Sequence, residues 1–423
     1  MTRRSEPSPL DRLAIQTVFT PTLEDVSQVL ELAVSNKASD IIFKHGNHPK
    51  VKVNGAWQSV EDLPKLKISE MDELVNLIMG EENAAKFKKE QEYDFQFSTE
   101  NLRFRVNAAY QSGGPFMTFR PIPKNPPILD DLTFINEEKI IPLLKRLVEL
   151  PRGLVLVTGP TGMGKSTTLA ALVRHINENF AKNIITIEDP VEFQHEDLKS
   201  IISQREVHND TESFARALRG VLRQTPDIIL VGELRDPETI EAALTAAETG
   251  HLVLGTLHTN SAPQAISRIL DVTSEGKVNL IKTQLAASLR AVITQQLVPK
   301  QDGTGKQVIL EVMLNEGPIE TLIKDGSGEL NKYYDQMTTN TSESVLMDEQ
   351  LARAARMKII SPEAASSRAI QPDRYGTFYQ NIQVQEGLPR GVRRATAATT
   401  APTTASTPET PPSAPSGWGR GKN

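Results

Sequence analysis

The sequence predicts an α/β protein in two parts, a small α+β domain followed by a larger domain built on a parallel sheet. Its 423 residues are more than one ordinary domain needs. Up to about residue 123, short strand patterns mix with helices. From Gly153 onward, aliphatic strands alternate with helices, which is typical of a parallel sheet covered on both faces. We therefore expect two folded domains.

Composition narrows the class of protein. Hydrophobic residues make up 38% and charged residues 24% of the chain, which is typical of a globular protein. No apolar run is long enough for a transmembrane helix, and Met1 to Ser8 lack the apolar stretch of a signal peptide, so we expect a cytoplasmic protein. The absence of cysteine excludes disulfides and thiolate zinc sites. A net charge of -6 argues against binding to a phosphate backbone, so no nucleic-acid partner is expected.

Residues 1–20 are predicted to be a polar leader, and residues 21–123 the small α+β domain. An amphipathic helix is expected from Leu23 to Asn36, and another near Ser69, which forms a capping box with Asp72. Asn54-Gly55 predicts a hairpin turn. The expected strands span residues 40–44, 49–53, 94–97, 103–109 and 116–120. This domain holds no catalytic constellation, so a scaffold is expected.

Residues 124–150 are expected to form a linker and a connecting helix, with a proline-rich start that could act as a hinge. The α/β domain is expected at residues 151–375. Its clearest strands are predicted at 154–157, 184–187, 228–231 and 252–254, and its helices at 166–177, 213–222 and 237–249. Beyond Asp271 we expect mostly helix, ending near Ile370. Residues 376–423 are expected to be a mostly disordered tail, because Ala, Thr, Pro, Ser, Gly and Arg dominate from Glu386.

One segment carries a phosphate-binding motif. Residues 159–166 match G-x-x-x-x-G-K-[ST] between a predicted strand and a predicted helix, a context that makes a chance match rare. Backbone N–H groups of such a loop point at phosphates, and the helix adds its positive dipole end. Lys165 is expected to reach the β- and γ-phosphate oxygens of ATP, and Ser166 to ligate Mg²⁺. The nucleotide-binding residues expected here are Gly159, Pro160, Thr161, Gly162, Met163, Gly164, Lys165, Ser166, Thr167 and Thr168.

Acidic residues follow two other predicted strands. Glu233 ends an aliphatic strand, where a Walker B acid would hold Mg²⁺ through water, although a solvated glutamate is also common there. Glu188, Asp189 and Glu192 follow a second strand within five residues. Crowded carboxylates raise one another's pKa and attract a cation, which suits a base that activates water. Among them Glu192 is the predicted catalytic base, and Glu188 a second catalytic candidate.

Two histidines, His251 and His258, bracket another predicted strand. Either could donate a hydrogen bond to the γ-phosphate and respond to its loss, but a histidine is as often an ordinary structural residue. Metal binding by the pair is disfavoured, because an extended strand separates them by more than a ligand span.

Together these motifs resemble the secretion and pilus-motor ATPase superfamily. The resemblance rests on the order and spacing of Gly159 to Thr168, Thr186 to Glu192, Val231 to Asp236, and Gly250 to Thr259. The segments Gln204-Arg-Glu-Val, Ala246-Ala-Glu-Thr-Gly-His and Ser288-Leu-Arg-Ala-Val-Ile are most similar to the PilT branch, the retraction ATPases of type IV pili. The likeness covers about Leu23 to Ile370.

The resemblance implies an architecture and a set of partners. The first domain would be PAS-like, and the second a RecA-like P-loop NTPase domain. The chain would form a homohexamer with ATP at its subunit boundaries. It would act with a platform protein at the cytoplasmic face of the inner membrane, as a peripheral protein with no transmembrane segment.

The resemblance also assigns roles to individual residues. Glu192 would be the catalytic base and Glu233 the Walker B acid. His251 and His258 would couple nucleotide state to domain movement. A basic group of the PAS-like domain would approach the nucleotide, and its matching residues are Arg103, Arg105 and Arg120.

One motif departs from the PilT pattern and leaves alternatives open. Retraction ATPases carry Ala-Ile-Arg-Asn-Leu-Ile, whereas Pro318 to Ile323 here read Pro-Ile-Glu-Thr-Leu-Ile, which inverts one charge. A pilus-assembly, type II or type IV secretion ATPase is therefore an alternative to a retraction motor. Rivals of another class are a nucleic-acid translocase and a non-catalytic accessory subunit of a ring.

Overall fold

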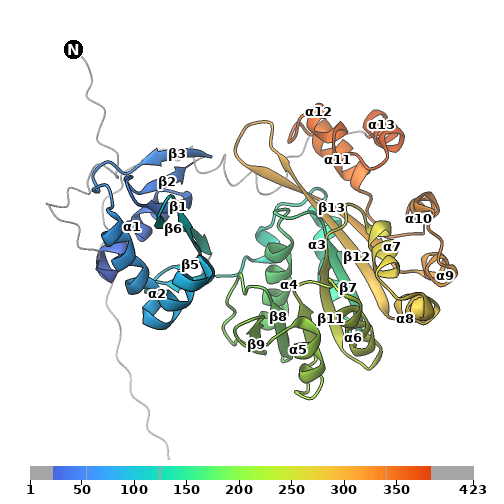
Figure 1. Cartoon of the computed structure of the whole chain (residues 1–423). Helices are drawn as coiled ribbons and strands as arrows, with labels where there is room; N and C mark the ends of the chain where they lie inside the picture. The colour runs from blue at the N-terminus through green and yellow to red at the C-terminus, as the bar shows by residue number, and fades with distance from the viewer. Residues whose placement is uncertain (1–21, 54, 123–124, 340, 383–423) are drawn as a thin grey trace, which may run out of the picture.

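The computed structural model describes residues 22–53, 55–122, 125–339 and 341–382. These residues form two domains, one around a six-stranded sheet and one around a seven-stranded sheet, as Figure 1 shows. The α+β and α/β fold class predicted from the sequence is confirmed. The predicted leader, residues 1–20, and the tail from residue 383 lie outside the described residues. Residues 372–381 form helix α13 (Pro372–Asn381), where a disordered tail was expected from residue 376.

The N-terminal domain is an antiparallel sheet with helices packed on it. Its strands run in the order β3-β2-β1-β6-β5-β4. They are β1 (Ala38–Lys44), β2 (Lys50–Val53), β3 (Ala56–Ser59), β4 (Glu92–Ser98), β5 (Arg103–Gln111) and β6 (Gly114–Ile122). Helices α1 (Leu23–Ser35) and α2 (Ile68–Glu90) bury their apolar faces against this sheet around Phe43, Phe104 and Phe119.

Two local predictions in this domain have different outcomes. The hairpin between β2 and β3 is present, and its Gly55 has a φ of +84°, while Asn54 lies outside the described residues. The capping box was placed two residues too late. Helix α2 begins at Ile68, and Glu70 accepts a hydrogen bond from the Lys67 N–H at 2.7 Å. Glu70 is the residue three positions after the cap, whereas Asp72 lies a further two residues into the helix and cannot reach the cap N–H.

The second domain has the parallel sheet that the sequence predicts. The strand order is β13-β12-β7-β11-β10-β8-β9. The parallel strands β7 to β11 are β7 (Gly153–Thr158), β8 (Asn183–Glu188), β9 (Ile201–Glu206), β10 (Ile228–Val231) and β11 (Leu252–Leu257). Strand β7 is buried on both sides, since Leu154 and Leu156 join one core cluster and Val155 and Val157 join another. Parallel strands covered on both faces consist of such continuous apolar runs.

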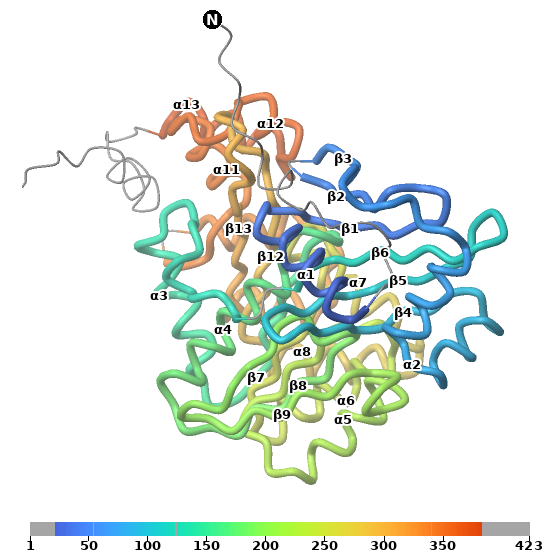
Figure 2. The backbone as a smooth tube through the Cα atoms, turned by 90° about the vertical axis from the view of Figure 1, so that its left-hand side faces the viewer, coloured from blue at the N-terminus to red at the C-terminus, as the bar shows by residue number. Residues whose placement is uncertain are grey.

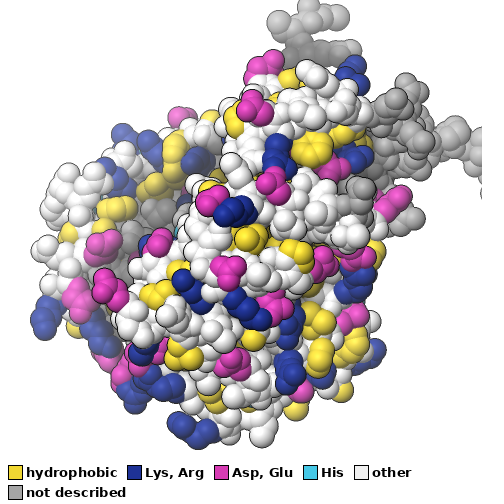
Figure 3. Space-filling view, turned by 90° about the vertical axis from the view of Figure 1, so that its right-hand side faces the viewer, with side chains coloured by type: hydrophobic (Ala, Val, Ile, Leu, Met, Phe, Trp, Pro, Cys, Tyr) yellow, Lys and Arg dark blue, Asp and Glu magenta, His cyan; other side chains and the backbone are white. Residues whose placement is uncertain are grey.

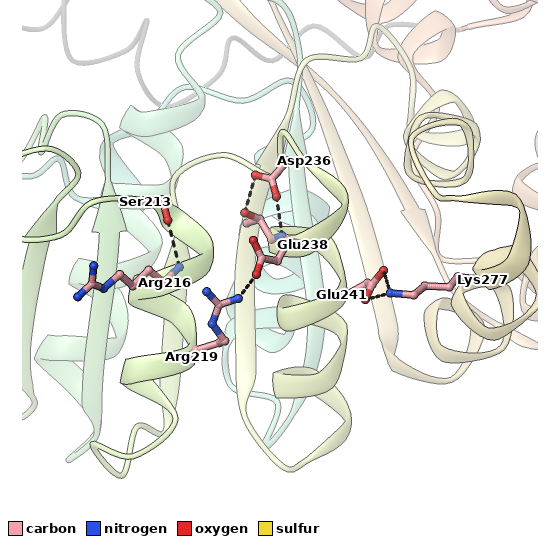
Figure 4. A network of polar contacts seen from close by, with 8 residues as sticks. Ser213, Arg216, Arg219, Asp236, Glu238, Glu241 and Lys277 are labelled. Atoms are coloured by element: carbon pink, nitrogen blue, oxygen red, sulfur yellow. Dashed lines mark hydrogen bonds and ion pairs between the residues drawn. The ribbon is translucent and has the colours of Figure 1, made fainter.

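Helices cover the two faces of this sheet. One core cluster is completed by α3 (Glu137–Val148) and α4 (Lys165–Asn179). The other is completed by α5 (Phe214–Val221), α6 (Pro237–Glu248), α7 (Ala262–Asp271) and α8 (Val278–Ser288). In Figure 4, Arg219 of α5 pairs with Glu238 of α6, and Glu241 of α6 pairs with Lys277 at 2.8 Å. Such exposed ion pairs join neighbouring elements but stabilise them little.

The prediction of mostly helix beyond Asp271 holds for six helices among the described residues but missed a pair of strands. A long hairpin, β12 (Leu289–Pro299) and β13 (Lys306–Leu314), follows α8, and β12 pairs in parallel with β7 as the second strand from one edge of the sheet. Both strands are largely buried, so they lack the alternation of polar and apolar residues that identifies a half-buried strand. The helices that follow are α9 (Gly317–Asp325), α10 (Leu330–Met337), α11 (Met347–Arg356), α12 (Pro362–Ser366) and α13.

The two domains are in contact. Figures 1 and 2 show the N-terminal sheet beside the edge of the second domain formed by β8 and β9. Gln96 of β4 donates a hydrogen bond to Glu206 of β9 across this boundary. The connection between the domains includes the short helix η2 (Leu129–Asp131) and is docked on α4, because Arg174 donates to the Pro126 carbonyl at 2.6 Å.

The outer face that carries the C-terminal helices presents both signs of charge. Figure 3 shows Lys and Arg side chains interspersed with Asp and Glu, with small hydrophobic groups between them. Among the described residues, no helix is long and apolar enough to cross a membrane.

Candidate nucleotide site

The predicted phosphate loop joins the end of β7 to the start of α4. Gly159 has a φ of +143°, and a Cβ atom there would lie 2.5 Å from the Gln295 carbonyl oxygen, so only glycine fits. Gly164 occupies the N-cap of α4 with a φ of 82°, and no side chain caps the helix. The first N–H groups of α4 therefore face the loop without a side-chain partner, which is the arrangement that binds phosphate.

Lys165 lies at the mouth of this loop. Its Nζ donates to the carbonyl of Gly159 at 2.6 Å and to that of Pro160 at 3.2 Å, and it lies 3.4 Å from His258 Nδ1. Burial lowers the pKa of Lys165, whereas the charges of Glu233 and Glu192 raise it. A partly desolvated ammonium beside a ring of N–H groups provides a point charge for a phosphate oxygen.

Strand β12 supports the loop from behind. The Gln295 amide donates to the Met163 carbonyl at 2.6 Å and accepts from the Thr168 hydroxyl at 2.7 Å. Thr158 and Thr294 share a further hydrogen bond at 2.8 Å. Gln295 and Thr168 are buried, so Thr168 lies behind the loop. Of the predicted nucleotide-binding residues, Thr168 is thus placed to hold the loop in shape.

A cavity of about 620 Å³ lies in front of the loop, at the carboxyl ends of the parallel strands. This is where open α/β sheets bind their ligands. The sequence-predicted residues that line it are Thr161, Gly162, Gly164, Lys165, Ser166, Thr167, Glu188, Glu192, Glu233, His258 and Arg105. Side chains from separate strands and from both domains therefore meet at one place.

Glu233 lies at the centre of a chain of charged groups. His258 Nε2 lies 3.3 Å from Glu233 Oε1, and the Arg235 Nε donates to Glu233 Oε2 at 2.6 Å. Arg235 also approaches Asp189 at 3.9 Å. Because His258 touches both Lys165 and Glu233, one imidazole joins the phosphate loop to the predicted Walker B carboxylate.

The acid loop, residues 189–195 between β8 and β9, carries the predicted base. Glu192 is exposed on the cavity wall. Glu188, just before the loop, accepts hydrogen bonds from the Thr186 hydroxyl at 2.7 Å and from the Gln204 amide at 3.2 Å. Burial raises the pKa of Glu188, and the nearby charge of Glu192 raises it further. The acid with a raised pKa at this loop is therefore Glu188, and burial rather than crowding is the main cause.

Some predicted site residues lie apart from the cavity. His251 precedes β11, whereas His258 follows it, which separates the two by about 20 Å of extended strand. The His251 Nδ1 lies 2.9 Å from the Ala246 carbonyl, so its ring is not placed to reach a phosphate at the loop. Arg120 pairs with Asp40 at 2.8 Å inside the N-terminal domain. Arg103 donates to Gln96 and lines a second cavity, of about 780 Å³, between the domains.

Comparison with known proteins decides the family. Residues 16–384 match the family described as Type II/IV secretion system protein. The chain belongs to this family.

Several relatives within the family are PilT-like. The chain is 43% identical over 323 residues to the twitching motility protein of Neisseria gonorrhoeae, covering 76% of this chain and 84% of the relative. It is 40% identical over 353 residues to the type IV pilus retraction ATPase PilT of Pseudomonas aeruginosa, covering 83% and 100%. A crystal structure of the pilus retraction motor PilT with bound ADP superposes with a TM-score of 0.75 at 37% identity, covering 82% of this chain and 97% of that one.

Sequence reasoning missed Gln295 in this family member. The residue lies 132 positions from Met163 in the chain, on a strand that was predicted to be helical. The usable signal was the polar pair Gln295-Gln296 inside an aliphatic run, because a buried amide needs partners.

Proposed function

We propose that this chain is a Mg²⁺-dependent ATPase that powers retraction of a type IV pilus. The observation that carries the proposal is the meeting of Lys165, Glu192, Glu233 and His258 on one cavity in front of the phosphate loop. Relatives named as a twitching motility protein and a pilus retraction ATPase support the biological role.

The residues present fit Mg-ATP. The uncapped N–H groups of α4 and the Lys165 ammonium suit the phosphates. Ser166 and Glu233 line the same cavity and would hold Mg²⁺, which keeps several of its water ligands when protein oxygens are few. When bound, Mg²⁺ neutralises charge that develops on the phosphates.

The carboxylates then divide the chemistry between them. Glu192, exposed to the cavity, would orient a water molecule and accept its proton. Glu233 pairs with Arg235, lies near His258 and follows β10 at the carboxyl edge of the sheet, a position that suits a role at the cation. Arg105 brings a positive charge from the N-terminal domain to the same cavity. Movement of that domain would therefore change the electrostatics at the phosphates.

The motor would work as a ring of identical chains. We infer a homohexamer that acts with a platform protein at the cytoplasmic face of the inner membrane, as the resemblance to PilT implies. The departure in the retraction motif leaves the fold of α9 intact, because Ile319 and Ile323 are buried while Glu320 points outward and pairs with Lys324 at 2.5 Å. The change is thus confined to the surface that a partner would meet.

Phosphate release by the purified full-length protein tests the enzymatic part of the proposal. The wild type should release phosphate from Mg-ATP, and Lys165→Ala should lower the rate to background, because phosphate charge is left unpaired. Arg219→Ala, which removes only the exposed pair with Glu238, is the matched control and should retain the wild-type rate. No turnover by the wild type would indicate a non-catalytic ring subunit.

A gene deletion in the source bacterium tests the biological part. Loss of a retraction motor should leave cells hyperpiliated and non-motile on surfaces, with rescue by the wild-type gene and not by Lys165→Ala. Loss of pili would instead indicate an assembly ATPase. Normal pili with a secretion defect would indicate a secretion ATPase, and turnover stimulated by DNA would favour a translocase.

A further inference from the structure

The acid loop is held in place by two side chains of β9. The Gln204 amide donates to the Phe193 carbonyl at 2.8 Å and accepts from the His195 N–H at 2.9 Å. The Glu206 carboxylate accepts from the Val191 N–H at 3.0 Å. Gln204 and Glu206 are two positions apart on a strand, so their side chains lie on the same face.

This attachment sets the orientation of Glu192. The backbone bonds fall on residues 191, 193 and 195, and the side chains of Val191 and Phe193 are buried. The side chain between them, Glu192, is left exposed to the nucleotide cavity. Any shift of this backbone would therefore move the predicted base.

Glu206 also reaches the other domain. Its Oε2, which accepts from Val191, accepts in addition from the Gln96 amide of β4, and its Oε1 accepts from Asn209. Gln96 lies directly opposite Arg105 in the pairing of β4 with β5, so the two side chains lie on the same face of the sheet. Arg105 lines the nucleotide cavity. One carboxylate oxygen thus connects the strand pair that carries Arg105 to the loop that carries Glu192.

We propose that Glu206 is a positioning residue that makes hydrolysis depend on the placement of the N-terminal domain. The proposal rests on the ATPase function proposed above. When the domain sits as in this structure, Gln96 and Val191 share the Glu206 carboxylate, and Glu192 and Arg105 face one cavity. When the domain moves away, the carboxylate loses one partner and the acid loop is less restrained.

Variants of the full-length chain separate this role from a general effect on folding. Glu206→Ala should lower kcat about 10- to 100-fold, since a displacement of about 1 Å at a catalytic group has effects of this size. The affinity for ADP should change less than about threefold, because the phosphate loop is held by β12. Glu206→Gln should restore most of kcat, since one amide oxygen can still accept from both Val191 and Gln96.

The link between the domains is tested by a double-mutant cycle. Gln96→Ala alone should lower kcat about 3- to 10-fold and should have little further effect in Glu206→Ala, where the contact between Gln96 and Glu206 is already absent. Asn209→Ala removes the third partner of the same carboxylate without touching the loop or the domain link, and serves as the matched control. Hydrogen exchange of nucleotide-free protein adds a readout independent of turnover. The Val191 amide should exchange faster in Glu206→Ala than in Glu206→Gln.

Each outcome bears on the proposal. A kcat loss with retained ADP affinity, rescue by glutamine and non-additive effects of Gln96→Ala would support it. An unchanged kcat in Glu206→Ala, additive effects in the cycle, or unchanged exchange at Val191 would overturn it. If Glu206→Ala does not fold, Glu206→Gln and Gln96→Ala still decide, because the proposal requires the first to be active and the second to be impaired. A wild type without turnover would refute the ATPase function itself, which is a distinguishable result.

Discussion

The phosphate loop and the acid loop face the same cavity but are held in different ways. The phosphate loop is held by β12, a strand inside the sheet, through the buried amide of Gln295. The acid loop is held by β9, an edge strand, through half-buried Gln204 and Glu206. Only the second arrangement among the described contacts at the cavity reaches across to the N-terminal domain, through Gln96. The proposed phosphate-binding loop and the proposed base are therefore supported by different parts of the molecule.

The difference has an energetic consequence. A hydrogen bond lost in a buried place leaves its partner unsatisfied, at a cost of about 1–3 kcal/mol, whereas half-exposed partners turn to water. Regions held by half-exposed bonds open more readily than the core. The phosphate loop should therefore keep its shape through a cycle, while the acid loop can follow the movement of the neighbouring domain.

The largest expected effect comes from changing Glu192, the proposed base, because this tests whether the two loops have separate roles. Glu192→Gln removes the proton acceptor from the acid loop and leaves the phosphate loop unchanged, so phosphate release should fall about 100-fold or more. The affinity for ADP, measured by calorimetry, should stay within about threefold of the wild type. Normal phosphate release from the purified variant would remove Glu192 from this role and end the division between the two loops.

A smaller effect is expected on the binding side. Gln295→Ala leaves the Met163 carbonyl and the Thr168 hydroxyl without their buried partner. We expect the affinity for ADP to weaken about tenfold and the unfolding temperature to fall, because a loss of about 1–3 kcal/mol divides between the loop and the fold. Gln296→Ala, the same change at the next residue of β12, points to the opposite face and is the control. If Gln295→Ala lowers kcat without weakening ADP binding, the two loops are not independently supported.

The same contrast explains what the sequence could predict. The phosphate loop is a contiguous motif whose glycines, lysine and following helix are read directly from neighbouring residues. Glu233 could be expected at the cavity because the carboxyl ends of parallel strands meet at one edge, whereas the residues alone left the role of His258 open. The sequence treated His251 and His258 alike because they belong to one short motif, although strand β11 lies between them and sets them at opposite ends. Contacts such as Gln295 with Met163 and Gln96 with Glu206 join residues 132 and 110 positions apart, and no local pattern predicts them.

A buried carboxylate in the hairpin that supports the phosphate loop contrasts with Glu206. Glu311 lies on β13, paired with β12, and is fully buried. It accepts hydrogen bonds from the Ala262 N–H at 2.7 Å and from the Tyr334 hydroxyl at 3.3 Å, and more weakly from the Met347 N–H at 3.4 Å. Burial raises the pKa of Glu311 to about 7, against the opposing effect of the two N–H groups. Like Glu206 it joins separate elements, but it has no access to the cavity.

The smallest effect on activity, and a measurable one on stability, is therefore expected at Glu311. Because the pKa of Glu311 is higher in the folded than in the unfolded protein, the folded state binds more protons between about pH 4.5 and 7. The contribution of Glu311 to the free energy of unfolding is therefore full at low pH and declines as the pH rises through 7. Glu311→Gln resembles the protonated form and should be the more stable protein at pH 8, on the order of 1–3 kcal/mol, with little difference at pH 4, below the unfolded pKa. Thermal unfolding of both proteins at several pH values measures this difference, to which Asp348 contributes because its charge also raises the pKa of Glu311. If kcat in Glu311→Gln stays within about twofold of the wild type while stability changes with pH, the hairpin that supports the phosphate loop acts through the fold and not through the rate. If kcat falls together with stability, β13 takes part in the catalytic cycle. The rigid support of the phosphate loop would then be limited to β12.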